Sequence, residues 1–523
     1  LLAPRATEAQ EGGDELARGE EVYVQWCAGC HGVDGTGDGP GAARMLPRPR
    51  DFTRALYQVR TTPSGGLPTD EDILHVIDVG MPGTAMPGWE DLLSRGERDA
   101  LVAYVKSLSP FFANSDAPEP VDFGSPPRVT DEVIAEGDSL YQEIECWRCH
   151  GQAGRGDGTS APTLEDDAGF PIWAADLTEN WHFNGCGTVE DIFRRLWTGM
   201  DGTPMPTFTD MIDAGIITEE QLWSVAHYVR SLSPEERPEV REVLVAERLE
   251  GAAVPTAPDD ERWDEVERFY VPLVGQIIVS PRWFDPRVDG IWVQALHDGS
   301  TLALRVSWSD PSASPDPEWA DFATAVEEAM EPEEDAGWAP GAPDRLVVQF
   351  PQTLTEGRER PYFLQGDARR PAYLWTWESG GAGGREQVAR GLGTAQDQEA
   401  SEQQLQVSAR HEDGRWQVVL VRDLATADST ADLQMAGGRT FPVAFRAWDG
   451  DNAEVGNRGA ISSWYFLHLR EPTPVTAYVA PVVALLLTAL LGLVVIRRAK
   501  AREEEAPTSP SVGARPAGAT AGG

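Results

Sequence analysis

The 523-residue chain contains very little lysine and little positive charge of any kind. Lys106 and Lys500 are its only lysines, and 43 lysines and arginines face 85 aspartates and glutamates, for a formal net charge of −42. Such an acidic chain is repelled by phosphate backbones and by anionic lipid headgroups, which argues against nucleic acid as a partner of the folded body. It favours a basic partner or a high-salt habitat.

Cysteine is also scarce, because five residues in a chain of this length do not make a disulfide scaffold. Four of them fall into two Cys-x-x-Cys-His strings, and the fifth, Cys186, is typical of a small buried hydrophobe. The first residues contain no full apolar core behind a charged start. We therefore expect residues 1–13 to be a disordered N-terminus or the remnant of an export signal.

One long apolar run lies near the other end of the chain, at residues 475–496. Its uncharged length is about the ~20 residues that a membrane-spanning helix needs, and it is longer than most buried core helices. Arg497, Arg498, Lys500 and Arg502 follow directly. Under the positive-inside rule this predicts a single transmembrane helix, a disordered cytoplasmic tail at 497–523, and everything before the helix outside the cytoplasm.

The remaining length predicts several domains, separated at proline-rich or charged joints. Two successive regions read as copies, since each opens with an amphipathic helix carrying a glycine four residues before a tyrosine and closes with a helix ending in Ser-Leu-Ser-Pro. The third region changes to two-residue alternation, which predicts an antiparallel β-sandwich. The expected boundaries are 14–112 and 131–236 for the two all-α regions, 113–130 and 237–260 for linkers, and 261–471 for the sandwich.

The two cysteine strings have the form of a c-type haem attachment site. Cysteines three apart share one face of a helical turn, so both thiols can bond one porphyrin while the next histidine is directed at the iron. A zinc site would need four ligands and a redox dithiol a βαβ context, and neither is visible here. The residues concerned are Cys27, Cys30 and His31 in the first region and Cys146, Cys149 and His150 in the second.

Each copy also carries a methionine loop, GMPGTAMPGW at Gly80–Trp89 and GMDGTPMPTF at Gly199–Phe208. Haem iron held by one histidine takes a sixth ligand, and a thioether raises its reduction potential. Cys27 to Met86 and Cys146 to Met205 both span 59 residues, a repeated reach that core-filling methionines would not explain. We favour Met86 and Met205 over the earlier methionines, Met81 and Met200, because the proline that follows stiffens the loop.

With these strings the first two regions resemble class I cytochrome c domains, through CAGCHG with TAMPGW and CWRCHG with TPMPTF. The resemblance implies that His31 and His150 are proximal iron ligands, that Met86 and Met205 are distal ones, and that the first and last helices of each domain cross. It also places a carbonyl that orients the histidine ring near Pro40 and Pro162.

The third region resembles the haem-binding subunit of the ethylbenzene and dimethylsulfide dehydrogenase family, through VDGIWVQALHDGSTLALRVSWSD, FLQGDARRPAYLWTWE and FRAWDGDNAEVGNRGAISSWYFLHL. That family holds a b-type haem between a methionine and a lysine and takes electrons from an iron-sulfur subunit of a molybdenum enzyme. Motif alignment puts the methionine at Gln365 and the lysine near Gly459, so we expect this domain to have lost its haem and to act in docking. Possible substitute ligands are Met330, Met435, His411, His468 and His297, the last expected to be exposed in an HDG turn.

The other histidines carry weaker signals. His75 and His227 fall within helical periodicity and are expected to be packed or solvated. His182 and Cys186, in WHFNGCG, would be two ligands with no others nearby, so a structural role is expected for them.

Together these features predict a membrane-anchored dihaem c-type cytochrome that transfers electrons in a respiratory chain, with its haem domains on the periplasmic side. Its partners would be a basic cytochrome or the subunits of a molybdenum and iron-sulfur oxidoreductase. Three alternatives remain open: a dihaem peroxidase, a three-haem relay with a b haem in the sandwich, and a binding module whose haems only report on a ligand.

Overall fold

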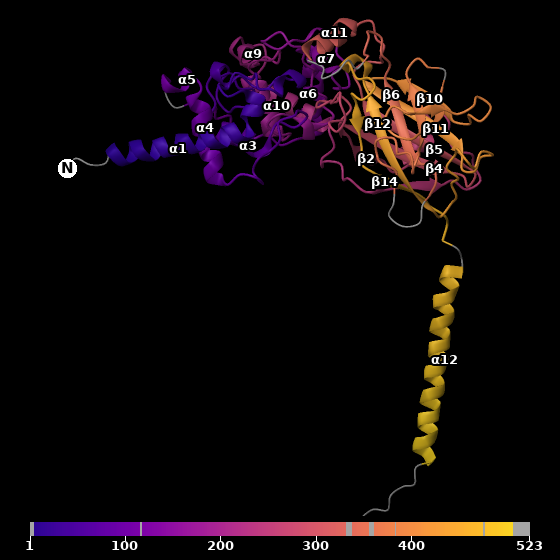
Figure 1. The fold of residues 1–523 in the computed structure, drawn as a ribbon. Coiled ribbons are helices and arrows are strands. Elements are labelled where there is room, and N and C mark those ends of the chain that lie inside the picture. Colours follow the sequence, from indigo (N-terminus) through magenta and orange to yellow (C-terminus); the bar gives the residue numbers. More distant parts are fainter. Residues whose placement is uncertain are drawn as a thin grey trace, which may run out of the picture. The chain divides into compact units, whose positions relative to one another are not determined.

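The computed structural model describes residues 5–115, 118–330, 337–354, 360–381, 383–473 and 476–505. The chain divides into two compact units, residues 1–470 and 471–523, and each is described by itself. Figure 1 shows the first unit as a helical part followed by a part built on strands.

The first helical region is held together by the crossing of its first and last long helices, α1 and α4. A Cβ on Gly19 of α1 would overlap the carbonyl oxygen of Ala100 in α4, so glycine lets the two backbones touch. Thr69 and Ser94 begin α3 and α4 with capping boxes. The helices are α1 (Arg5–Trp26), α2 (Ala28–His31), α3 (Asp70–Val79), α4 (Arg95–Ser107) and α5 (Pro110–Ala113), with 3-10 turns η1 (Ala42–Arg44) and η2 (Phe52–Arg54). Helix α1 covers residues 5–13 of the segment predicted to be a disordered N-terminus or the remnant of an export signal, and residues 1–4 lie outside the described residues.

The second helical region repeats this plan. Gly137 of α6 lies against the carbonyl of Ser224 in α10 as Gly19 lies against Ala100. Tyr141 donates from its hydroxyl to the Gly151 carbonyl over 2.6 Å, and Tyr23 of α1 donates to Gly32 over 2.7 Å. The elements are α6 (Asp131–Glu143), α7 (Trp147–His150), η3 (Ala161–Thr163), η4 (Asn180–His182), α8 (Val189–Thr198), α9 (Thr209–Asp213) and α10 (Glu219–Ser231). The predicted helix crossings are therefore present in both copies.

The segment between the two helical regions lies along both of them. Val121 donates its backbone N–H to the Thr61 carbonyl of the first region over 2.8 Å. The ring of Phe123 packs on Phe193 and Trp223 of the second region, with ring centroids 5.1 and 6.1 Å apart. This proline-rich joint therefore contacts both helical regions, at Val121 and at Phe123.

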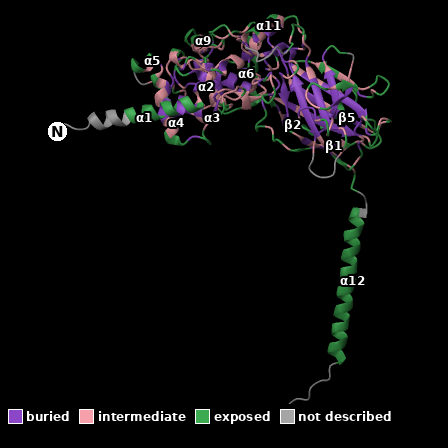
Figure 2. Cartoon of the chain, in the orientation of Figure 1, coloured by how far each residue is buried: buried purple, intermediate pink, exposed green. Residues whose placement is uncertain are grey.

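The third region is a sheet of 14 strands in two layers that share one core. Strand β12 joins the layers, because its first half pairs with β14 and its second half with β6. Figure 2 shows these strands buried along most of their length. The strands are β1 (Val243–Arg248), β2 (Phe269–Pro272), β3 (Val274–Gly275), β4 (Gly290–His297), β5 (Thr301–Ser309), β6 (Arg345–Pro351), β7 (Ala372–Glu378), β8 (Arg385–Ala389), β9 (Gln396–Asp397), β10 (Gln406–His411), β11 (Arg415–Asp423), β12 (Thr440–Trp448), β13 (Ala460–Ile461) and β14 (Tyr465–Leu469), with α11 (Ala320–Ala329), η5 (Glu261–Glu265) and η6 (Gly450–Asn452) between them.

Strand β1 changes two expectations. It lies within residues 237–260, which the composition had suggested were a linker, and it pairs in parallel with both β4 and β14. The sheet is therefore mixed rather than wholly antiparallel. A charged stretch conceals this strand because Leu244 and Ala246 alone supply its fully buried face.

The second unit contains α12 (Thr476–Glu505). It includes almost all of the predicted span and continues past Ile496 through the basic cluster; Val475 and the tail from residue 506 lie outside the described residues. The helix is long and apolar enough to cross a membrane, and Figure 2 shows it exposed along its length. An exposed apolar surface of this kind fits a lipid environment.

Candidate haem sites

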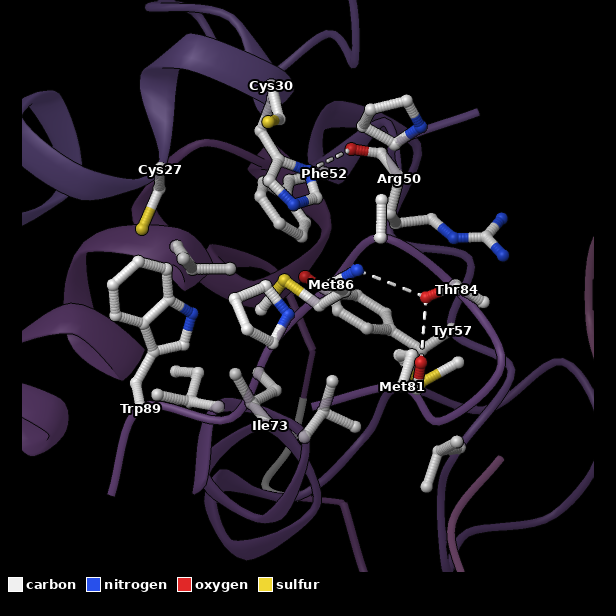
Figure 3. A pocket seen from close by; sticks show the side chains of 18 of the residues that line it. Cys27, Cys30, Arg50, Phe52, Tyr57, Ile73, Met81, Thr84, Met86 and Trp89 are labelled. Carbon is white, nitrogen blue, oxygen red and sulfur yellow. Dashed lines mark hydrogen bonds between the residues drawn. The ribbon is translucent and has the colours of Figure 1, made fainter. Parts of the chain in front are cut away.

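One cavity in the first helical region brings the predicted attachment and ligand residues together (Figure 3). Cys27, Cys30 and His31 reach it from the short helix α2, and the Cys30 and His31 amides donate to the Cys27 carbonyl. Met86 enters from the loop after α3. The remaining walls are mainly apolar and include Ile73, Ile77, Trp89, Leu101 and Val105.

A second cavity, in the other helical region, has the same construction. Cys146, Cys149 and His150 line it from α7 and Met205 lines it from the loop after α8. Its apolar walls include Leu164, Leu177, Ile192, Leu196, Val225 and Val229. Two thiols, an imidazole and a thioether in an apolar enclosure are the donor set that a covalently attached haem needs, so the residues present fit that group in both cavities.

Both histidines are oriented by a backbone carbonyl. The Nδ1 atom of His31 lies 3.0 Å from the Arg50 carbonyl oxygen, and that of His150 lies 3.0 Å from the Ala175 oxygen. An Nδ1–H that donates to a carbonyl fixes the tautomer and leaves Nε2 with a free lone pair for a metal. Burial lowers the pKa of both imidazoles and favours this neutral form.

These carbonyls correct the expectation that residues near Pro40 and Pro162 orient the rings. In the structure the orienting segment comes 19 residues after His31 and 25 after His150. A short repeat marks it, Arg-Asp-Phe-Thr at residues 50–53 and Ala-Asp-Leu-Thr at 175–178. In each copy the aspartate accepts hydrogen bonds from the N–H and hydroxyl of the threonine two residues later. The unequal spacing from the histidines hid this repeat in the sequence.

The methionine loops have the same hydrogen-bond pattern in both copies. The Met81 amide donates to the Met86 carbonyl over 3.0 Å, and the Met200 amide donates to the Met205 carbonyl over 3.1 Å. Inside the first loop, the Thr84 hydroxyl donates to Met81 over 2.8 Å and accepts from the Met86 amide over 3.2 Å, as Figure 3 shows.

Thr203 makes the same two bonds in the second loop, with the same distances. The threonines two residues before Met86 and Met205 therefore close the two loops, a role not predicted from the sequence. The sequence signal for it is the Thr-x-Met-Pro string common to both loops.

The cysteine thiols are not activated in this environment. Burial raises the pKa of Cys27 and of Cys146 to about 12, which keeps both thiols protonated. Reactive dithiols have lowered pKa values, so the raised pKa values of these thiols argue against the redox-dithiol alternative.

The two cavities approach each other at Gln58, which lines both. Arg195 of the second region donates to the carbonyls of Gln58 and Arg60 over 3.0 and 3.1 Å. Arg60 in turn donates to the Thr198 carbonyl and to Asp201, over 2.7 and 2.9 Å. The contact between the helical regions is thus built around the wall that separates the cavities.

The two positions expected to supply the axial ligands of a b haem, Gln365 and Gly459, make other contacts. The Gln365 side chain accepts from the Gly393 amide over 3.1 Å, and the Gln365 amide donates to Gln349 over 3.0 Å. Gly459 packs directly against the Trp448 indole, so a longer side chain there would have to displace that ring. Neither position fits an axial ligand.

Two expectations about single residues are wrong. His297 is fully buried rather than exposed, and its Nε2 lies 2.8 Å from the Arg470 carbonyl, because β1 pairs along it and covers the turn. Cys186 is exposed rather than buried, with φ +85° and its sulfur 3.7 Å from Nε2 of His75.

His182, expected to be structural, forms a cluster with two carboxylates. Its Nδ1 lies 3.3 Å from Glu179 and 3.2 Å from Asp289 of the sheet region.

The chain matches three family models. Residues 14–105 match "Cytochrome C oxidase, cbb3-type, subunit III", residues 134–233 match "Cytochrome c", and residues 260–404 and 390–460 match "Ethylbenzene dehydrogenase". Each helical region therefore has its own cytochrome c match, and the sheet region matches a different family.

Curated relatives agree with these matches. The chain is 28% identical over 211 residues to the "Putative respiratory nitrate reductase heme subunit ORF7" of Haloferax mediterranei, covering 40% of this chain and 67% of that protein. It is 30% identical to the "Chlorate reductase subunit gamma" of Ideonella dechloratans, covering 33% and 62%. It is 35% identical to "Cytochrome c55X" of Paracoccus denitrificans, covering 20% and 88%. The chain thus spans about two thirds of the length of the first two relatives.

A cytochrome c domain carries covalently bound haem c, and both cavities hold the residues that such attachment requires. The chain therefore belongs to the cytochrome c family through its two helical domains, to which it joins a domain of the ethylbenzene dehydrogenase family.

Proposed function

We propose that this chain is a membrane-anchored cytochrome that carries two haem c groups and passes single electrons between a respiratory reductase complex and a second redox protein. The observation that carries the proposal is the pair of matching cavities on either side of Gln58. Two redox centres in cavities that share Gln58 in their linings would make a relay within a single chain.

Each residue has a defined role in this proposal. Haem iron, when bound, supplies the one-electron change. Cys27, Cys30, Cys146 and Cys149 would provide the thioether attachments, His31 and His150 would hold the iron through a nitrogen, and Met86 and Met205 would hold it through a sulfur. The apolar walls exclude water, which limits reorganisation on electron transfer and, with the thioether ligand, favours a high reduction potential.

Met205 is favoured over Met200 by its packing, since it contacts the hydrophobic core of its domain together with Cys146. Met81 and Met86 both line the first cavity, and there the choice of Met86 rests on the equivalent position of Met205. A ligand at both sixth positions disfavours peroxide chemistry, which needs an open or displaceable position on the iron.

The sheet domain would serve in docking rather than as a third haem site. Hydrogen bonds hold Gln365 and the Trp448 indole packs against Gly459, so the two expected ligand positions supply no axial ligand. The names of two relatives, a nitrate reductase haem subunit and a chlorate reductase gamma subunit, support the subunits of a reductase complex as the partner class.

The helix α12 and the basic residues that follow its apolar part would place both haem domains outside the cytoplasm. The net charge of −42 would attract a basic soluble partner, at rates that fall as salt screens the attraction.

The proposal is tested by a pyridine haemochrome spectrum and an intact mass of the full chain in detergent. Two c-type haems and no b-type haem are expected. A Cys146→Ser, Cys149→Ser double variant should lose one covalent haem and keep the other, with Cys186→Ser as the matched control that keeps both. A b-type haem in the unaltered chain would refute the docking role of the sheet, and rapid peroxide turnover would favour the enzyme alternative.

A further inference from the structure

Three carboxylates that belong to neither haem site meet at one end of the sheet domain. Asp310 follows strand β5, Asp344 precedes β6 and Asp449 follows β12. All three are fully buried, and one oxygen from each lies within 4.8 Å of the others. Three acidic side chains from three separate strand ends are thus collected in the interior, where an isolated charge is very costly.

Neutral donors orient the three carboxylates. Asp344 accepts from the Ser314 and Gly450 amides, over 2.7 and 3.0 Å, and from the Trp416 indole N–H over 2.9 Å. Asp310 accepts from the Ser312 amide over 3.2 Å and the Trp308 indole over 3.3 Å, and Asp449 from the amides of Asp451 and Asn452 over 2.8 and 3.1 Å. Outer hydrogen bonds of this kind hold the ligands of a metal site in place.

One oxygen of the cluster has no partner. Among the described residues, none is hydrogen-bonded to Oδ2 of Asp449, whose side chain is fully buried. Buried oxygens without partners cost free energy, and natural structures supply them with a proton, a water or an ion.

The charges of the cluster indicate which of these species, a proton, a water or an ion, suits it. All three carboxylates are fully buried and their oxygens lie within 4.8 Å of one another, so three ionised groups there would repel one another strongly. The three carboxylates therefore cannot all ionise alone, and water would not neutralise them. A cation with two positive charges would.

We propose that Asp310, Asp344 and Asp449 bind a Ca²⁺ ion. Calcium takes about six to eight oxygen ligands in a flexible geometry, so it can use carboxylates that come from three separate strand ends. Magnesium would retain several waters.

The ion would stabilise the part of the sheet domain that contacts the second helical domain. The Asp449 loop continues through η6 to Asn452, whose side chain accepts from the Trp173 indole of the helical domain over 3.2 Å. Trp173 lines the second cavity. Calcium therefore connects the strand ends of the sheet to one wall of that cavity, without taking part in electron transfer.

The direct test is calorimetric titration of the full chain, stripped with EDTA in detergent, with CaCl₂ and separately with MgCl₂. One Ca²⁺ per chain should bind, Mg²⁺ should bind at least tenfold more weakly, and saturating Ca²⁺ should raise the Tm by several degrees. Absence of calcium binding and an unchanged Tm would overturn the proposal, and preference for Mg²⁺ would overturn the assignment to calcium.

An Asp449→Asn variant gives a second test, because its effect on stability should have opposite signs in the calcium-free and the calcium-bound protein. In EDTA it should be as stable as the unaltered chain or more so, since it removes a buried charge, whereas in Ca²⁺ it should be less stable and bind at least tenfold more weakly. Asp423→Asn, an exposed position at the end of β11, is the matched control and should keep the calcium response. If Asp449→Asn fails to fold, the titration of the unaltered chain still decides the question.

Discussion

At the scale of single residues, the methionine loops show how the chain can select one sulfur of two. The loop hydrogen bonds join Met81 and Met86 through Thr84, so the backbone at Met86 is fixed while both side chains face the cavity. Pro87, which follows Met86, has a fixed φ and so stiffens the loop directly after the methionine.

We predict that Met86→Leu lowers the reduction potential of the first haem by on the order of 0.1–0.3 V, a fraction of the ~0.8 V range that axial ligands span. The methionine-to-iron charge-transfer absorbance of that haem should also disappear. Met81→Leu is the matched control and should change both quantities little. Redox titration with optical detection measures both, and the reverse pattern would assign the ligand to Met81.

At the scale of elements, each helical domain depends on one glycine at its helix crossing. Gly19 and Gly137 lie against carbonyl oxygens of α4 and α10, so any Cβ there must push the helices apart. Overpacking of this kind costs about 1–3 kcal/mol.

We therefore predict that Gly19→Ala lowers the free energy of unfolding of the first domain by about 1–3 kcal/mol. Gly96→Ala, in the first turn of α4 where nothing lies within 4 Å of the added Cβ, should change it by less than about 1 kcal/mol in the stabilising direction. Denaturant titration followed by haem absorbance measures this. Equal effects of the two substitutions would show that the crossing is not tightly packed.

Some of these features could be predicted from the sequence, and others could not. The crossing glycines, the attachment strings and the 59-residue reach recur at fixed positions, so repetition identified them without any contact information. The orienting carbonyls at Arg50 and Ala175 were not identified, because the short Asp-x-Thr repeat that follows them stands at unequal distances from the two histidines.

Strand β1 was concealed for a different reason. Its neighbours in the sheet are distant in sequence, and the parallel pairing that buries His297 depends on tertiary contacts alone. The same holds for the Asp310, Asp344 and Asp449 cluster, whose members come from three separate parts of the chain.

At the scale of the whole molecule, an ionisable cluster joins the second helical domain to the sheet. His182 lies between Glu179 and Asp289, and burial raises the pKa of Glu179 to about 7. Burial alone would lower the pKa of His182, but its hydrogen bond to Glu179 and the charge of Asp289 raise it overall. The folded chain therefore keeps protons here that the unfolded chain has released.

Because the folded state binds more protons, we predict that the Tm falls as pH rises from about 5 to 8. The Glu179 contribution is present near its ordinary pKa of 4.5 and is lost as pH rises through about 7, and the His182 contribution is lost in the same direction. Glu179→Gln should flatten this slope by a few degrees. Glu250→Gln, at an exposed loop position, should leave the slope unchanged. Calorimetry across this range tests it, and identical slopes in all three proteins would refute it.

The shared wall at Gln58 has a consequence for how the molecule stores charge. An electron placed in one cavity adds negative charge beside the other, in an enclosure where screening is weak. The second electron should therefore enter at a lower potential than the first, even if the two centres were intrinsically identical. With such negative redox cooperativity the molecule would accept one electron readily and a second one only at a lower potential. It would therefore tend to hold a single electron and pass it on before it takes up another.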